Sequence, residues 1–95
     1  LCEALESPAP GELTFPILQK TVADIAVVTD AEVAEAMRYA FSVLKLVVEP
    51  GGSVGLAALL AGKVKDFGGE AAIGLVLSGG NVDPELFARV LRREV

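Results

Sequence analysis

Histidine is absent from this 95-residue chain, and cysteine occurs only once. Without histidine, the chain lacks the side chain most often used as a general base near neutral pH and as a metal ligand. Zinc chemistry is therefore not expected. The single cysteine, Cys2, excludes an internal disulfide and favours a reducing compartment, which we take to be the cytoplasm. We interpret Cys2 as a packing residue without redox chemistry.

Basic residues are few, and long apolar runs are absent. Eight lysines and arginines stand against 13 aspartates and glutamates, which gives a net charge of −5. Because no basic cluster is present, nucleic acid is not an expected partner. The longest apolar run, Val54–Ala61, is far shorter than the ~20 residues that span a bilayer. No signal-peptide pattern is present either. We therefore expect no membrane partner.

Hydrophobic residues, in contrast, are abundant. They make up 53% of the chain before its ten glycines are counted, against roughly 45–50% with glycine included in soluble domains. A chain of this length forms one domain at most. It would bury only roughly 60–65% of its unfolded surface. The composition therefore indicates apolar faces that await a partner, and we expect the chain, which does not begin with methionine, to be a fragment.

The clearest helix pattern begins at Thr29. A hydroxyl residue followed three positions later by Glu32 is a capping-box sequence. The apolar residues behind it recur at spacings of four, four, three and four, which places them on one helix face. They are Val33, Met37, Phe41, Leu44 and Val48. We expect an amphipathic helix that ends at Glu49, because the residue before a proline is disfavoured in the α region.

Three further helices are expected, at residues 13–20, 53–62 and 85–93. Pro16 requires the first of these to begin near it. The second consists of small and apolar residues on all sides and is expected to be buried, with a polar turn at 63–69 behind it. Asp83 and Pro84 have the residue types of an N-cap and a first helical residue, so they predict the start of the third.

Two apolar runs favour β-strands, at residues 24–28 and 71–77. The second is short, bounded by glycine and almost unbroken, as in a strand buried on both faces of a parallel sheet. Ligands of such sheets bind beyond the carboxyl ends of the strands, where Ser78 would lie. Since two strands cannot make a stable sheet, other strands must come from elsewhere. The expected fold class is α/β, part of a parallel or mostly parallel sheet flanked by helices.

Two segments carry a resemblance to a known family. Residues 49–58 read Glu-Pro-Gly-Gly-Ser-Val-Gly-Leu-Ala-Ala, and residues 76–83 read Val-Leu-Ser-Gly-Gly-Asn-Val-Asp. With residues 3–7, 28–33 and 45–48, they resemble the carboxyl-terminal part of the threonine/serine dehydratases. Those enzymes belong, with serine racemase, to the fold type II pyridoxal-phosphate enzymes. The resemblance implies that residues 1–95 are a single region, the C-terminal section of the large cofactor-binding domain.

The resemblance implies roles for the turn after the second predicted strand. It places Ser78 against the pyridine nitrogen of the cofactor. A neutral hydroxyl can donate to an unprotonated nitrogen and makes the ring a weaker electron sink than a carboxylate would. A weaker sink suits prompt β-elimination. Gly79 and Gly80 would let the backbone pass close to the ring, and Asn81 would support the turn, a role that any turn residue could also fill.

Three other residues are assigned by the same resemblance. It places Glu49 beside the cofactor pocket, although a carboxylate at the positive end of the 53–62 helix is an equal alternative. Ala4 is the counterpart of a glycine that the family commonly has close to the cofactor. Ser7 aligns with a position near the substrate carboxylate, with a simple turn residue before Pro8 as its alternative.

Several parts of the family's site have no counterpart in this chain. The lysine that holds the cofactor as a Schiff base lies in a Ser-x-Lys motif, and none of the lysines (Lys20, Lys45, Lys63 and Lys65) has that context. The glycine-rich phosphate loop and the acidic metal cluster of racemase-like members have none either. We therefore expect no catalytic residue and no metal site in this chain, and no activity from it alone.

The function implied by the resemblance is a pyridoxal-phosphate-dependent dehydratase. It would convert L-threonine, L-serine or a close β-hydroxy amino acid to a 2-oxo acid and ammonia, as a homo-oligomer completed by the amino-terminal part of the enzyme. Racemisation or 3-hydroxyaspartate dehydration on the same scaffold remains open. So does a non-catalytic module that binds an amino acid, a phosphate or a nucleotide.

Overall fold

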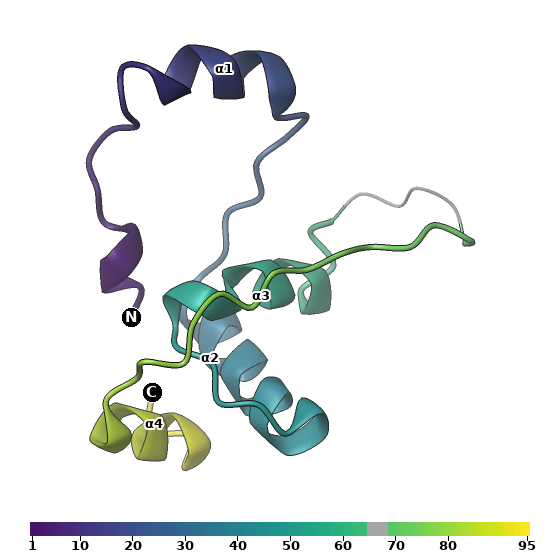
Figure 1. Cartoon of the computed structure of the whole chain (residues 1–95). Coiled ribbons are helices and arrows are strands. Elements are labelled where there is room, and N and C mark those ends of the chain that lie inside the picture. The colour runs from purple at the N-terminus through teal and green to yellow at the C-terminus, as the bar shows by residue number, and fades with distance from the viewer. Residues whose placement is uncertain (65–68) are drawn as a thin grey trace.

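The structure is a computed structural model that describes residues 1–64 and 69–95 (Figure 1). Within these ranges every regular element is a helix. In chain order they are η1 (Glu3–Leu5), α1 (Thr14–Thr21), α2 (Asp30–Tyr39), η2 (Ala40–Leu44), η3 (Gly51–Ser53), α3 (Val54–Leu60) and α4 (Pro84–Leu91). No helix in the described ranges has the length and apolar character needed to cross a membrane.

The predicted α/β sheet is wrong for this structure: the described residues contain no strand. The segments 24–28 and 71–77 are irregular, and their apolar side chains are largely exposed, 80% for Ile25 and 79% for Val76. A strand is defined by hydrogen bonds to a neighbouring strand. Among the described residues, the segment 71–80 makes one backbone bond to another segment, from Glu49 N–H to the Gly79 carbonyl. An apolar run predicts a strand only where it has a neighbour to pair with.

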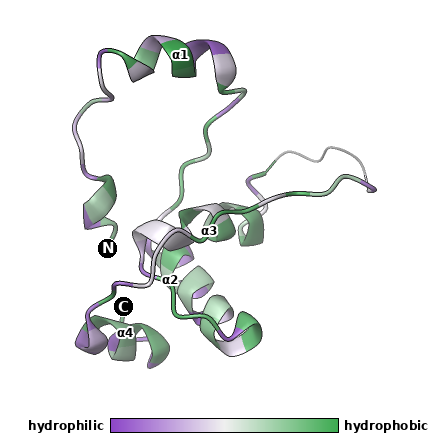
Figure 2. Cartoon of the chain, viewed as in Figure 1, coloured by the Kyte–Doolittle hydropathy of each residue, from purple (hydrophilic) through white to green (hydrophobic). Residues whose placement is uncertain are grey.

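The core lies along α2, which packs against both α3 and α4 (Figure 1). Small side chains such as Ala36 on α2 and Ala57 on α3 let the two helices approach closely. The buried core residues are Val33, Ala34, Ala36, Met37, Ala40, Val48, Leu56, Ala57 and Val90. Figure 2 shows further apolar positions along α1 and the extended segments, outside this core. The expectation of apolar faces that await a partner agrees with their exposure.

The capping box at the start of α2 is confirmed. Thr29 Oγ1 accepts a hydrogen bond from Glu32 N (3.2 Å), and Glu32 Oε2 accepts one from Thr29 N (2.8 Å). The helix ends earlier than expected, because it passes into the π-helical turn η2 and stops at Lys45, whose φ of 62° is left-handed. Phe41 and Leu44 lie within this turn and are 40% and 42% exposed, unlike the buried Val33.

The helices predicted around residues 13–20 and 85–93 are present with small shifts. Helix α1 begins two residues before Pro16, which therefore lies in the first turn, where no backbone N–H is needed. Asp83 caps α4 by accepting a hydrogen bond from Leu86 N (2.9 Å), with Pro84 as the first helical residue.

Helix α3 is shorter than the predicted helix and only partly buried. It covers Val54–Leu60, and Leu60 is 46% exposed. The expectation of burial on all sides is therefore wrong at its carboxyl end. The predicted polar turn at 63–69 lies largely outside the described residues, which omit 65–68.

The carboxyl end of α4 is attached to α2 by a hydrogen bond to its backbone and by an ion pair. Arg38 Nη1 donates to the Val90 carbonyl (2.6 Å), and Arg38 Nη2 donates to Glu35 Oε1 (2.8 Å). Arg93 also donates to Glu35. The hydrogen bond from Arg38, together with that from Arg93, holds the pKa of the Glu35 carboxyl below its ordinary value. The contact holds the last turn of α4 against α2.

Loss of the cap at Thr29 is expected to destabilise the protein. Thr29→Ala leaves Glu32 N without its acceptor, which costs about 1 kcal/mol of unfolding free energy. Urea denaturation of the variant measures the loss. Thr21→Ala is the control, because Thr21 lies at the exposed end of α1 and bonds only back to the Ile17 carbonyl. An equal loss in both variants would show that the cap contributes nothing specific.

The carboxyl of Glu32 is expected to titrate at a higher pH when Lys63 is removed. Lys63 Nζ donates to Glu32 Oε2 (2.8 Å), and this bond, followed by the one from Thr29 N, lowers the pKa of Glu32. A lowered folded-state pKa stabilises the protein above the unfolded-state pKa, and this stability is lost as pH falls through the folded value. Lys63→Met should raise the pKa of Glu32 in a ¹³C NMR titration. Lys20→Met, on the distant α1, should leave it unchanged.

Candidate functional site

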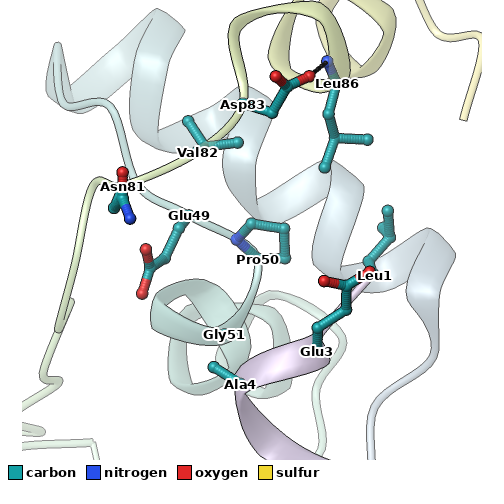
Figure 3. Close-up of a pocket in the computed structure, with 10 residues that line it drawn as sticks. All are labelled: Leu1, Glu3, Ala4, Glu49, Pro50, Gly51, Asn81, Val82, Asp83 and Leu86. Carbon is teal, nitrogen blue, oxygen red and sulfur yellow. Dashed lines mark hydrogen bonds between the residues drawn. The ribbon is translucent and has the colours of Figure 1, made fainter.

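A pocket of about 630 Å³ lies between the start of the chain and the start of α4 (Figure 3). Three segments form it: η1, the turn that leads into η3, and the residues around the N-cap of α4. The lining residues are Leu1, Glu3, Ala4, Glu49, Pro50, Gly51, Asn81, Val82, Asp83 and Leu86.

Three of the predicted site residues meet in this pocket. Ala4, Glu49 and Asn81 all line it, although they come from widely separated parts of the sequence (Figure 3). Ser78, Gly79 and Gly80 directly precede Asn81 but are not among the lining residues. Ser7 also lies outside it, where its hydroxyl donates to the Ala9 carbonyl (3.4 Å). That local bond fits the alternative of a turn residue.

The turn 49–52 packs directly against the turn 78–80. Glu49 N–H donates to the Gly79 carbonyl (2.8 Å). A Cβ built on Gly79 would lie 2.6 Å from Glu49 Oε1, and one built on Gly52 would lie 3.0 Å from the nitrogen and oxygen of Gly79. A Cβ on Gly80 would lie 2.8 Å from the Val47 carbonyl oxygen. These glycines are therefore needed for the two segments to touch.

The close contact gives Gly79 and Gly80 a role that the sequence patterns did not predict. The space beside Gly79 is taken by the Glu49 carboxylate, and that beside Gly80 by the Val47 carbonyl. Their predicted approach to a cofactor ring stays a prediction. The spacing of some thirty residues between the two glycine pairs carries no periodic signal, so only a three-dimensional arrangement could reveal the contact.

Ser78 presents a free hydroxyl. Its residue is exposed, and the described residues provide it with no hydrogen-bond partner. The apolar run before it is exposed as well, apart from the half-buried Leu77. A hydroxyl without an internal partner can donate to an external acceptor such as a ring nitrogen, so the predicted role of Ser78 stays a prediction that its surroundings allow.

Carboxylates dominate the charge of the pocket. Glu3, Glu49 and Asp83 line it, and none of its lining residues is a lysine or an arginine. One oxygen of Asp83 is used by the cap of α4. Among the described residues, no group of three potential ligands is placed to hold a metal ion. Beside the pocket, partial burial raises the pKa of the Cys2 thiol, which favours the unreactive form of a packing residue.

Comparison with known proteins decides the family. Residues 1–79 match the family described as "Pyridoxal-phosphate dependent enzyme". The chain belongs to this family. The family depends on pyridoxal phosphate as its cofactor, and the predicted resemblance is confirmed. No solved structure matches the chain.

The relatives of this chain include lyases and racemases. The chain is 46% identical over 82 residues to an L-threo-3-hydroxyaspartate ammonia-lyase from Pseudomonas sp., covering 86% of this chain and 25% of the relative. It is 42% identical over 76 residues to a serine racemase from Oryza sativa subsp. indica, covering 77% and 22%. It is 38% identical over 93 residues to an L-threonine ammonia-lyase from Geobacter sulfurreducens, covering 98% and 23%. The chain thus spans about a quarter of the length of the curated relatives it matches.

The residues present fit one end of the cofactor. Pyridoxal phosphate offers a ring nitrogen, which accepts a hydrogen bond, and an anionic phosphate. The free hydroxyl of Ser78 suits the nitrogen. The pocket does not suit the phosphate, because its charged lining side chains are carboxylates. Ser78 thus has a hydroxyl suited to the ring nitrogen, and the lining of the pocket has no cation suited to the phosphate.

The glycine contacts predict a graded response to alanine. Gly80→Ala places a methyl group against the Val47 carbonyl and should cost about 1–3 kcal/mol of unfolding free energy, because backbone must move. Gly79→Ala should cost less, because the flexible Glu49 carboxylate can move away. Gly74→Ala is the matched control, since a Cβ there meets nothing within 4 Å. Denaturant titration of the three variants measures the order, and equal losses would contradict the contacts.

Proposed function

We propose that this chain forms part of a pyridoxal-phosphate-dependent dehydratase. The enzyme would convert a β-hydroxy amino acid, L-threonine or L-serine, to a 2-oxo acid and ammonia. The observation that carries the proposal is the convergence of Ala4, Glu49 and Asn81 on one pocket in a chain of this family. Ser78, whose hydroxyl is free, lies three residues before Asn81 in the sequence. The similarity to several ammonia-lyases supports the same reaction.

The family resemblance gives each residue a role, which we take over in this proposal. When bound, the cofactor supplies an electron sink for bond cleavage at the substrate's α-carbon. Ser78 donates a hydrogen bond to the ring nitrogen and, being neutral, leaves that nitrogen unprotonated. The Cβ positions of Gly79 and Gly80 face Glu49 and the Val47 carbonyl, and the backbone of these glycines would pass close to the ring. Glu49, fixed against Gly79, presents an acceptor for hydrogen bonds at the pocket wall, and Asn81 supports the turn beside it.

The rest of the site is proposed to come from elsewhere in the enzyme. The lysine that holds the cofactor and the phosphate-binding loop would lie in an amino-terminal part. This chain would be the C-terminal section of the cofactor domain, and Ser7 would approach the substrate carboxylate. We further propose a homo-oligomer in the cytoplasm. The exposed apolar side chains of α1 and of the segments 24–28 and 71–77 are consistent with contacts to further protein.

Serine racemisation is a second candidate, supported by the similarity to plant serine racemases. The similarity to L-threo-3-hydroxyaspartate ammonia-lyase is higher in identity. The pocket itself favours substrates with a neutral side chain, since three carboxylates line it without a basic residue. A second substrate carboxylate would meet like charges there, which disfavours binding.

A product assay distinguishes the three reactions. The full-length protein, loaded with pyridoxal phosphate, is incubated separately with L-threonine, L-serine and L-threo-3-hydroxyaspartate. Formation of 2-oxo acid from L-threonine or L-serine is the expected result. D-Serine, detected by chiral chromatography without 2-oxo acid, would establish the racemase instead. A product from hydroxyaspartate alone would refute the preference for neutral side chains, and no product from any substrate would refute the proposal.

Removal of the Ser78 hydroxyl is expected to slow the reaction. Ser78→Ala in the full-length enzyme loses one hydrogen bond to the cofactor ring, and a net loss of about 1.4 kcal/mol corresponds to about tenfold in kcat/KM. Ser42→Ala is the control, because Ser42 is an exposed residue of η2, away from the pocket. Full activity of Ser78→Ala would contradict the assigned contact.

A further inference from the structure

Ser53 stands out because it is a fully buried polar residue with one hydrogen-bond partner. Its relative exposure is 0%, and its hydroxyl donates to the Glu49 carbonyl (2.9 Å). Ser53 also occupies the position immediately before α3, where a serine commonly caps the helix. Its side chain makes no capping bond. Instead, the hydroxyl points back to Glu49, a residue that lines the pocket.

The bond from Ser53 completes the fixation of Glu49. The Glu49 carbonyl accepts a second bond, from Gly52 N (3.1 Å), and Glu49 N–H is bonded to the Gly79 carbonyl (2.8 Å). The next residue is the buried Pro50, which restricts the backbone of the residue before it. Both peptide groups of Glu49 are therefore held. What remains free is rotation within its side chain, whose carboxylate lies beside Gly79.

We infer that Ser53 is a positioning residue for Glu49. Hydroxyls often donate to the carbonyl four residues earlier within a helix. Here that carbonyl belongs to Glu49, which precedes the helical turn, and the Glu49 side chain lines the pocket. Ser53 lies directly before α3, which is part of the core. Its hydrogen bond therefore links the start of this helix to the backbone that carries the Glu49 carboxylate. The inference rests on the proposed function, in which Glu49 contacts the cofactor.

A double-mutant cycle in the full-length protein tests the inference. The dissociation constant of pyridoxal phosphate is measured for the parent, Ser53→Ala, Glu49→Gln and the double variant, and urea denaturation is measured in parallel. Loss of one hydrogen bond by Ser53→Ala should weaken cofactor binding about fivefold. In the Glu49→Gln background the same substitution should change binding less than twofold, because the carboxylate that Ser53 positions is gone although the backbone carbonyl that it bonds remains. Ser53→Thr, which keeps the hydroxyl, should restore parental binding, and Ser42→Ala is the control.

The outcomes separate the inference from the proposed function. Equal weakening by Ser53→Ala in both backgrounds, or no weakening in either, would overturn the positioning role. If Glu49→Gln itself leaves cofactor binding unchanged, the proposed role of Glu49 fails. Crystal structures of Ser53→Ala and the parent then still test the inference: a displaced Glu49 carboxylate supports it, and an unmoved one overturns it.

Discussion

The site depends on one close contact between two backbone segments. Glu49 N–H donates to the Gly79 carbonyl, and no side chain on Gly52, Gly79 or Gly80 intervenes. This contact attaches the extended segment 71–80 to the helical core, and it sets where Asn81 and the N-cap of α4 lie. Without it, the pocket would lose one wall. The glycines act here by the absence of a Cβ, because their neighbours occupy the space in which a Cβ would lie.

The helices could be predicted because their signals are local. Thr29 and Glu32 sit three residues apart and satisfy each other's backbone, and at α4 the Asp83 carboxylate accepts from Leu86 N while Pro84 begins the helix. Such bonds depend on neighbours in the chain and on nothing else. The π turn at 40–44 and the left-handed Lys45 could not be predicted in this way. No residue type marks them, and Phe41 and Leu44, which lie in the π turn, are more exposed than the expected apolar stripe requires.

The strands failed for the opposite reason, since a strand is a relation between two segments. The composition of 24–28 and 71–77 fits a pleated surface, but the described residues provide no neighbour for either one. The family resemblance named Ala4, Glu49 and Asn81, and the structure brings these three residues to one pocket, while their roles toward the cofactor stay predictions. It did not reveal that the Glu49 carboxylate lies beside Gly79, nor that Ser53 donates a hydrogen bond to the Glu49 carbonyl. Those facts depend on angles and distances that a motif does not contain.

Helix α4 joins two very different environments. Its first turn borders the pocket through Asp83 and Leu86, and its last turn is held to α2 through Arg38, Glu35 and Arg93. Glu35 and Arg93 are exposed, so dissolved ions screen their attraction. Val90 is fully buried, and the bond from Arg38 to its carbonyl is part-buried, so dissolved ions weaken it less. The end of α4 remote from the pocket therefore keeps its attachment to α2 in high salt.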